Sequence, residues 1–246
     1  MKKSRLDVVL LARGLFETRA KAAAAIMAGQ VLVDGVPALK AGAPTGEDAA
    51  IELIKPCPYV SRGGLKLEAA LDNFPIAIEG RICLDVGAST GGFTDCLLQK
   101  GAALVYAVDV GTAQLHDKLR KDPRVVSREQ THAKSMKPEW FSPAPDLAVI
   151  DVSFISLNQV LPPALACLKK PFEVLALIKP QFEVGPKLAP KGVVRDDSGR
   201  KLAIEKIRSI LGELGVVEKG LYECPVHGPK GNVEYFIWLV SGGGPG

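Results

Sequence analysis

The sequence predicts an α/β protein in which a mostly parallel sheet, covered by helices on both faces, follows a small α+β domain. Three observations carry this prediction. Strand and helix patterns alternate from residue 82 onward, a glycine-rich turn joins the first of these strands to a helix, and two closely spaced strand patterns end the chain. Alternation is typical of parallel sheets, whereas a closely spaced pair of strands must be antiparallel.

The first 54 residues are interpreted as a compact helix-helix-hairpin domain. Helical spacing covers residues 6–15, a second helix runs over 19–28 to Gly29, and short β-branched strands follow at 31–33 and 49–54. The first 22 residues contain six basic and two acidic side chains, so they hold an excess of +4, equal to the net charge of the whole chain. We therefore expect a polyanion partner at this end, with a solvated basic face as the alternative.

Two prolines make Lys55-Pro56-Cys57-Pro58 a stiff linker. The predicted boundaries are 1–54 for the first domain, 55–60 for the linker and 61–246 for the second domain. In the second domain, strands are expected at 82–86, 104–109, 124–127, 146–151, 173–178, 221–225 and 233–240, and helices at 65–73, 94–99, 112–120, 155–168 and 199–214. The last two strands form the antiparallel pair.

Several classes of protein are excluded by what the sequence lacks. The five cysteines contain no CxxC pair and the three histidines show no ligand spacing, so neither a disulfide framework nor a metal site is expected. The basic start imitates a signal peptide, but Asp7 and Arg13 interrupt it. No apolar run of about 18 residues is present. We expect a soluble cytoplasmic protein without a membrane partner.

The glycine turn in Ile82–Thr94 indicates the class of cofactor. A dinucleotide fingerprint G-x-G-x-x-G fails because Ser89 stands at its second glycine, and the pattern is D-x-G-x-x-x-G-G instead. Asp85 can accept a hydrogen bond from an ammonium group but would repel a pyrophosphate, which favours the methionine end of S-adenosylmethionine. The residues expected to bind this cofactor are Asp85, Gly87, Ala88, Ser89, Gly91, Gly92 and Phe93 in the turn, Asp109 and Val110 after the second strand, and Glu129 and Gln130 after the third.

Charged residues at strand ends narrow the range of reactions that the sequence predicts. Asp151 ends the fourth strand in DVSF, Lys179 ends the fifth, Glu234 opens the last, and Lys66 lies in the helix at 65–73. Such a sheet would bring these two lysines and two carboxylates to one cleft. The (D/N)PP(Y/F) motif of amine methyltransferases is absent, and no cysteine has the context of a carbon-5 pyrimidine methyltransferase.

Motifs along the whole chain resemble known families. RLDVVLLARGL followed by TRAKAAAAIMAGQVLVDG resembles the small RNA-binding domain of ribosomal protein S4. SRGGLKLEAAL, DVGASTGGFT, VDVG, DVSF, LIKPQFE and GNVEYF resemble FtsJ-type ribose 2′-O-methyltransferases, and the combination resembles the TlyA (haemolysin A) family. The resemblance implies a Rossmann-like, seven-stranded methyltransferase sheet that uses S-adenosylmethionine and no metal to methylate cytidine 2′-hydroxyls in ribosomal RNA.

The resemblance also implies roles for the four charged residues, which occupy the family's K-D-K-E positions. We expect Lys179 to be the base that takes the hydroxyl proton, Asp151 to orient it, and Lys66 and Glu234 to position the groups. A lysine can serve as a base only if it loses its proton far below the ordinary pKa of about 10.4. Two departures from the family stand out: Thr131-His132-Ala133 replaces an asparagine expected after the third strand, and the linker lacks tryptophan.

Basic residues outside this cleft are expected to contact RNA. Residues 182–200 form a long segment rich in glycine and proline, interpreted as a lid on the substrate side, with disorder as the alternative. The predicted RNA-binding residues are Lys2, Arg5, Arg19, Lys21, Arg62, Lys187, Lys191 and Arg195.

Three other functions fit the sequence less well. A catalytically silent RNA-binding factor of ribosome assembly would show a broken tetrad or glycine turn, and both are intact. A cytolysin, suggested by the haemolysin label, would need a secretion signal or an inserting segment. A nicotinamide oxidoreductase is excluded by Ser89 and the terminal antiparallel strands.

Overall fold

A computed structural model describes residues 3–27, 29–54 and 57–242. Contacts divide the chain into two compact units, Met1–Cys57 and Pro58–Gly246. The predicted Lys2, and Lys55 and Pro56 of the predicted linker, lie outside the described residues.

The first unit packs two helices against short strands. Helices α1 (Leu6–Ala12) and α2 (Arg19–Met27) bury Leu6, Leu10 and Ile26 in one small core. Strands β3, β2 and β5 form an antiparallel sheet, and β1 pairs with β4, a contact the sequence pattern did not predict. The strand bounds are Lys3–Arg5 (β1), Val31–Val33 (β2), Val36–Pro37 (β3), Pro44–Gly46 (β4) and Ile51–Leu53 (β5).

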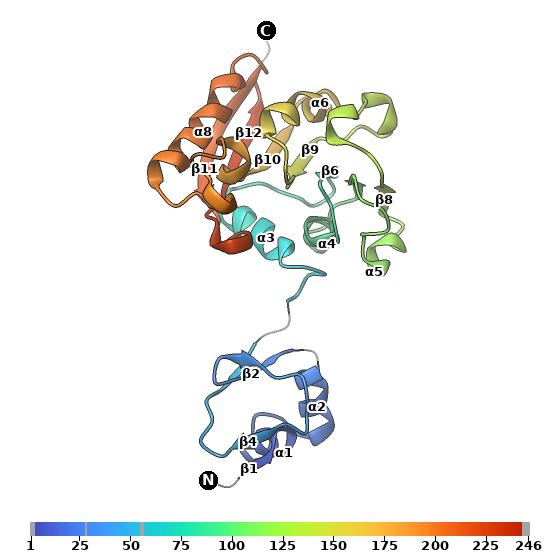
Figure 1. The fold of residues 1–246 in the computed structure, drawn as a ribbon. Helices are drawn as coiled ribbons and strands as arrows, with labels where there is room; N and C mark the ends of the chain where they lie inside the picture. Colours follow the sequence, from blue (N-terminus) through green and yellow to red (C-terminus); the bar gives the residue numbers. More distant parts are fainter. Residues whose placement is uncertain (1–2, 28, 55–56, 243–246) are drawn as a thin grey trace. The chain divides into compact units, whose positions relative to one another are not determined.

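The second unit is built on one seven-stranded sheet of order β11-β12-β10-β9-β6-β7-β8 (Figure 1). The strand bounds are Ile82–Val86 (β6), Leu104–Val108 (β7), Val125–Arg128 (β8), Leu147–Ile150 (β9), Glu173–Ile178 (β10), Val216–Glu223 (β11) and Tyr235–Ser241 (β12). Strand β12 is antiparallel to both its neighbours, and the other pairs are parallel. The predicted seven-stranded α/β fold is confirmed.

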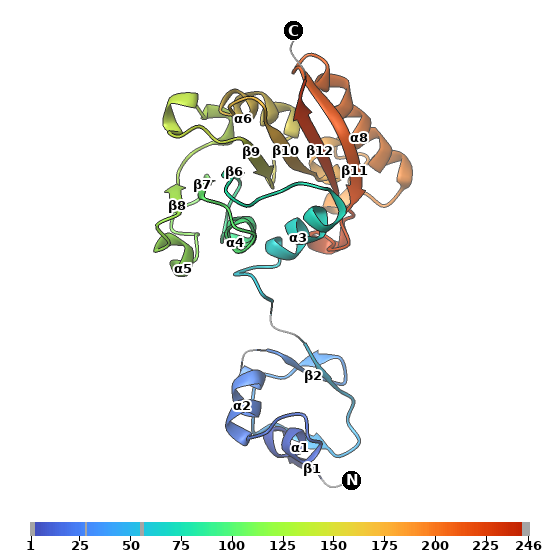
Figure 2. The same cartoon turned by 180° about the vertical axis from the view of Figure 1, so that it is seen from behind.

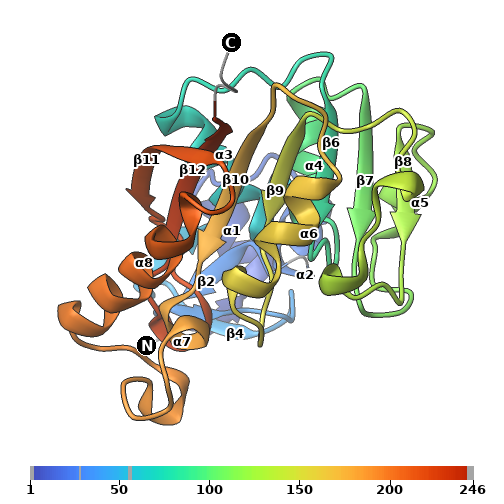
Figure 3. The same ribbon diagram turned by 90° about the horizontal axis from the view of Figure 1, so that it is seen from above.

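Helices cover both faces of this sheet, which Figures 2 and 3 show from behind and from above. Successive residues of a strand face opposite ways. Cys83 therefore packs with α3 (Gly63–Asn73), α4 (Gly92–Gln99) and α5 (Asp117–Arg120), whereas Leu84 packs with α6 (Leu161–Ala166) and α8 (Asp197–Leu211). The remaining α7 spans Pro180–Glu183, directly after β10. This doubly covered sheet leaves the carboxyl ends of its parallel strands free for a site.

Three predicted elements differ from the structure. The helix expected at 112–120 is only α5, because Ala113 has a positive φ of 52° and donates its amide hydrogen bond to Glu129. The helix expected at 155–168 is a 3-10 turn, Leu157–Gln159, followed by α6, whose first turn holds Pro162 and Pro163. Proline lacks the amide hydrogen that a continuous helix needs. Strand β11 begins at Val216, five residues before its predicted start, and carries a bulge between Glu218 and Gly220.

Candidate active site

Lys179 and Asp151 form an ion pair at the carboxyl ends of two neighbouring strands. Strand β10 ends at Ile178 and β9 at Ile150, so both side chains leave the same edge of the sheet. The Lys179 Nζ lies 2.5 Å from Asp151 Oδ1 and donates a hydrogen bond of 2.9 Å to Ser153 Oγ. The Lys179 side chain is 9% exposed and that of Asp151 is 20% exposed. The amine is thus held by two oxygens with little access to solvent.

Lys66 and Glu234 form a second, deeper pair. Lys66 lies on α3, and its Nζ donates a 2.6 Å hydrogen bond to Glu234 Oε2. The Glu234 side chain is fully buried, and its other oxygen accepts a 3.3 Å hydrogen bond from Gln181. A Cβ at Gly228 would lie 2.1 Å from Glu234 Oε1, so the loop before β12 can close over this carboxylate only with glycine there. The four predicted tetrad residues are therefore joined as two lysine–carboxylate pairs.

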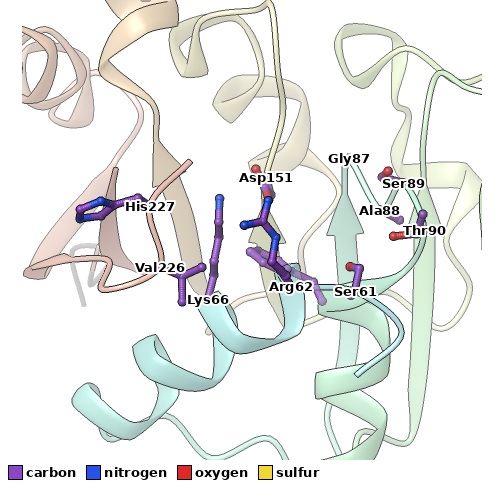
Figure 4. A pocket seen from close by; sticks show the side chains of 13 residues that line it. Ser61, Arg62, Lys66, Gly87, Ala88, Ser89, Thr90, Asp151, Val226 and His227 are labelled. Atoms are coloured by element: carbon purple, nitrogen blue, oxygen red, sulfur yellow. The ribbon is translucent and has the colours of Figure 1, made fainter. Parts of the chain in front are cut away.

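Two cavities meet beside Asp151. The larger, about 600 Å³, is lined by Asp109 and Val110 after β7, Thr131 and His132 after β8, and Ser153 after β9. The smaller, about 250 Å³, lies among Ser61 and Arg62 at the start of α3, Lys66, the glycine turn and His227 (Figure 4). Gly87, Ser89 and Asp151 line both. An extended ligand with two chemically different ends could therefore occupy both cavities and place its middle at Asp151.

The glycine turn is shaped by close backbone contacts. A Cβ at Gly87 would lie 2.4 Å from the Asp151 carbonyl oxygen, and Gly87 has a φ of 87°. A Cβ at Gly92 would lie 2.3 Å from Ser61 Oγ and 2.8 Å from the Gly64 nitrogen. These positions allow the ends of β6 and β9, and the starts of α3 and α4, to approach each other. Gly91, at a φ of 94°, instead leaves room for Leu119.

Asp85 is sealed behind this turn. It is 0% exposed, accepts a 2.6 Å hydrogen bond from Thr94, and lines neither cavity. Its Oδ1 has no hydrogen-bond partner among the described residues. Burial raises the pKa of the Asp85 carboxyl to about 7, and the hydrogen bond from Thr94 opposes this rise. The direct contact predicted between Asp85 and a ligand's ammonium group is therefore not available in this conformation.

Of the other residues predicted to bind the cofactor, some line the two cavities and some do not. Ala88 and Phe93 line the smaller cavity, and Asp109 and Val110 line the larger one. Asp109 accepts hydrogen bonds from the backbone of Ser89 and Gly111 at 2.8 and 2.7 Å, which ties the glycine turn to the end of β7. Glu129 and Gln130 line neither cavity: Glu129 binds the Ala113 amide, and Gln130 donates to Thr112. The cavity wall after β8 is instead Thr131, His132, Ala133 and Lys134.

Comparison with known families decides the identity of this domain. Residues 59–241 match the family described as FtsJ-like methyltransferase, and residues 4–48 match the S4 domain. The chain belongs to the FtsJ-like methyltransferase family. The resemblance inferred from the motifs is thereby confirmed, for the S4 domain as well as for the FtsJ-like domain.

Relatives cover nearly the whole chain. The 16S/23S rRNA (cytidine-2′-O)-methyltransferase TlyA of Mycobacterium tuberculosis is 45% identical over 97% of this chain and 90% of the relative. Hemolysin A of Brachyspira hyodysenteriae is 43% identical over 96% of this chain and 99% of the relative. A solved structure from Streptococcus thermophilus that bears a hemolysin name is 44% identical, covers 100% of this chain and 90% of its own, and has a TM-score of 0.77.

Sequence patterns missed two residues at the rim of the FtsJ-like site. His227 lines the smaller cavity, and in the view of Figure 4 Lys66 lies between it and Arg62. Phe154 is 90% exposed, has a φ of 63° and packs against Phe182, with ring centroids 5.0 Å apart and ring planes tilted by 49°. A strained, exposed aromatic residue is unusual outside functional sites. The DVSF motif contained this signal, since Phe154 follows a strand end at the site, whereas His227 had none.

The predicted RNA-binding residues differ in whether they pair with acidic side chains, line a cavity or are exposed. Arg5 and Arg19 both bind the buried Asp7, with three nitrogen–oxygen distances of 3.0 Å, and Lys21 pairs with Glu17. Arg62 lines the smaller cavity, and Figure 4 shows it extending toward Asp151. Lys187, Lys191 and Arg195 are exposed in the segment between α7 and α8. Along this segment Val194 donates to Asn232 Oδ1, so the predicted lid is bound to the loop before β12.

The described ranges contain no cluster of three or more histidine, cysteine, aspartate or glutamate side chains that could hold a metal. Within the same ranges, every helix is too short or too polar to cross a membrane.

Proposed function

We propose that this protein transfers a methyl group from S-adenosylmethionine to the 2′-hydroxyl of a cytidine in ribosomal RNA. The observation that carries this proposal is the Lys179–Asp151 pair: Asp151 lines both cavities, and Lys179, which lines neither, lies directly behind it. The reaction named for the Mycobacterium tuberculosis relative supports the choice of acceptor. The acceptor would come from ribosomal subunits, and the protein would act in the cytoplasm.

The cavities suit the two ends of the cofactor. The larger cavity offers Asp109 to ribose hydroxyls, and the smaller offers the glycine turn and the start of α3 to the amino-acid end. Bound across both, S-adenosylmethionine supplies an electrophilic methyl group. Asp151, which lines both cavities, would then lie beside the reacting centre, and Gly87, which also lines both, allows the backbone to approach the Asp151 carbonyl oxygen.

Lys179 is the proposed base. Its unprotonated amine would take the proton of the 2′-hydroxyl, so that the oxygen could accept the methyl group that bound S-adenosylmethionine would supply. Asp151 and Ser153 hold the Lys179 nitrogen in place, which reduces the loss of freedom at the transition state. Lys66, which lines the smaller cavity and is oriented by the buried Glu234, would help to position the acceptor.

Phe154 offers a stacking surface for the base of the acceptor nucleotide. Single-stranded RNA bases are commonly stacked on exposed aromatic side chains. Phe154 lies three residues after Asp151, and Phe182 supports it from α7. An unpaired base on this surface would bring its ribose toward Lys179.

The proposal is tested by incubating the protein with labelled S-adenosylmethionine and separate small and large ribosomal subunits. Label should enter ribosomal RNA at a cytidine and survive alkaline hydrolysis as an uncleaved dinucleotide, because a 2′-O-methyl group blocks cleavage. Binding of subunits without any transfer of label would favour the silent assembly factor. The intact glycine turn and the paired tetrad disfavour that alternative, and no observation on the described residues favours a cytolysin.

Asp7→Asn is expected to weaken RNA binding by the first unit by about three- to ten-fold, although it makes the protein more positive. Asp7 fixes the guanidinium groups of Arg5 and Arg19, whose side chains remain 55% and 54% exposed. Without the carboxylate, the two arginines must be ordered when RNA binds. Filter binding to ribosomal RNA measures the effect, and tighter binding by the variant would contradict it.

The same cluster predicts a pH dependence. The hydrogen bond from Arg5, with weaker help from Arg19, lowers the pKa of Asp7 from 3.8 to about 2. Because this pKa is lower in the folded than in the unfolded chain, the ionised Asp7 stabilises the unit above about pH 4. That contribution is lost as the pH falls to about 2.

A further inference from the structure

Two turns of the same sequence lie against each other beside the active site. Pro190–Gly192 and Pro229–Gly231 each read Pro-Lys-Gly and form 3-10 turns. Lys191 has φ 55° and ψ 22°, and Lys230 has φ 59° and ψ 18°. The glycines that follow have φ of 76° and 79°. Each lysine therefore occupies the left-handed region, a strained conformation for a residue other than glycine.

The two turns are locked to each other by hydrogen bonds. Lys230 Nζ donates a 2.9 Å bond to the Lys191 carbonyl oxygen. The buried Asn232 donates to the Gly192 carbonyl at 2.9 Å and accepts from the Val194 amide at 3.2 Å. Asn232 lies two residues before Glu234 of the tetrad. The pair of turns is thus a fixed extension of the active site.

The contacts explain one lysine but leave the other without a role in the fold. Lys230 is needed because its ammonium group holds the neighbouring turn. The ammonium group of Lys191 is exposed and bonds to no group among the described residues, although glycine or asparagine would fit its backbone more easily. A strained turn that is held on several sides and presents one free cation is suited to binding an anion.

We propose that the paired Pro-Lys-Gly turns bind an RNA backbone phosphate near the acceptor nucleotide, with Lys191 making the contact and Lys230 and Asn232 positioning it. This inference rests on the proposed function, because it assumes an RNA substrate in the adjoining site. It gives the predicted lid on the substrate side a specific, preformed contact. A phosphate contact adds affinity and fixes register without reading sequence.

Lys191→Gly provides the test, because it removes the ammonium group while glycine accepts the same backbone conformation. The full-length variant and the wild-type protein are titrated with purified ribosomal subunits over a series of salt concentrations. We expect affinity to fall by about three- to five-fold and the slope of log affinity against log salt to decrease by about one. Affinity for S-adenosylmethionine should stay unchanged and the melting temperature should not fall, because glycine relieves the backbone strain, and Lys191→Arg should retain most of the RNA affinity.

Lys219→Ala is the matched control, since it removes an exposed lysine from the middle of β11. If Lys191→Gly binds subunits like the wild type, or no more weakly than Lys219→Ala, the inference is overturned. The titration requires no methyl transfer, so the two proposals are judged separately. A wild-type protein that binds subunits but transfers no label would refute the proposed function and leave this result standing.

Discussion

Lys179→Ala is expected to lower the turnover number of methyl transfer by about 10²–10⁴-fold, the usual contribution of a positioned general base. The Lys179 amine is held 2.5 Å from Asp151, which lines both cavities, and 2.9 Å from Ser153, which lines the larger one. Single-turnover assays with saturating cofactor and ribosomal subunits measure the loss directly.

Lys179→Arg separates a base from a fixed positive charge. Arginine keeps the cation and the partner of Asp151, but it does not lose its proton in proteins. Both variants should therefore be inactive, while calorimetry shows unchanged affinity for S-adenosylmethionine. An active arginine variant would assign Lys179 an electrostatic role, and an active alanine variant would remove it from the chemistry.

The sequence predicted best those features for which a residue pattern has only one structural explanation. The apolar runs at 82–86 and 173–178 coincide with β6 and β10, because buried parallel strands tolerate few polar residues. Strand ends then fixed the positions of Asp151 and Lys179, since parallel strands present their carboxyl ends at one edge. Pairing of Lys66 with Glu234 followed from the fold, across 168 residues of sequence.

The contacts that loops make could not be predicted from the sequence. Residues 112–116 have helical composition, but Glu129 and the positive φ of Ala113 hold them in an open loop. That same bond occupies Glu129, which does not line the larger cavity, so its predicted contact with the cofactor stays a prediction. His227 reached the site only because Gly228 lets its loop close over Glu234.

Asp85→Asn is expected to stabilise the protein at neutral and alkaline pH while weakening cofactor binding. Burial raises the pKa of Asp85 from 3.8 to about 7, with the charges of Asp151 and Asp109 adding to the rise. The folded chain thus binds this proton more tightly than the unfolded chain, and ionisation of Asp85 reduces stability as the pH rises from about 4 to about 7. The rise in the pKa of Asp85 from 3.8 to about 7 corresponds to roughly 4 kcal/mol of unfolding free energy, which is the largest stabilisation expected for Asp85→Asn.

Asparagine cannot ionise, so the difference in unfolding free energy between Asp85→Asn and the wild type should grow from near zero at pH 4 to its full value above pH 7. Urea titrations at several pH values measure this difference. Thr94→Val removes the hydrogen-bond donor to Asp85, so ionisation of Asp85 should destabilise this variant more than it destabilises the wild type. A pH-independent difference would show that Asp85 is already ionised without penalty.

Ionised Asp85 is buried with only one of its two oxygens hydrogen-bonded, which destabilises the folded protein. This loss of stability is explained if the bound cofactor stabilises the ionised carboxylate. S-adenosylmethionine carries an ammonium and a sulfonium group against one carboxylate, and its net positive charge on the other side of the glycine turn would favour ionised Asp85 through space. Binding near pH 7 should then release a fraction of a proton, seen as a dependence of the calorimetric enthalpy on the ionisation enthalpy of the buffer. Asp85→Asn should abolish this release and bind the cofactor more weakly above pH 7. Equal proton release by both proteins would assign the linkage to another group and leave Asp85 with only its hydrogen bond from Thr94.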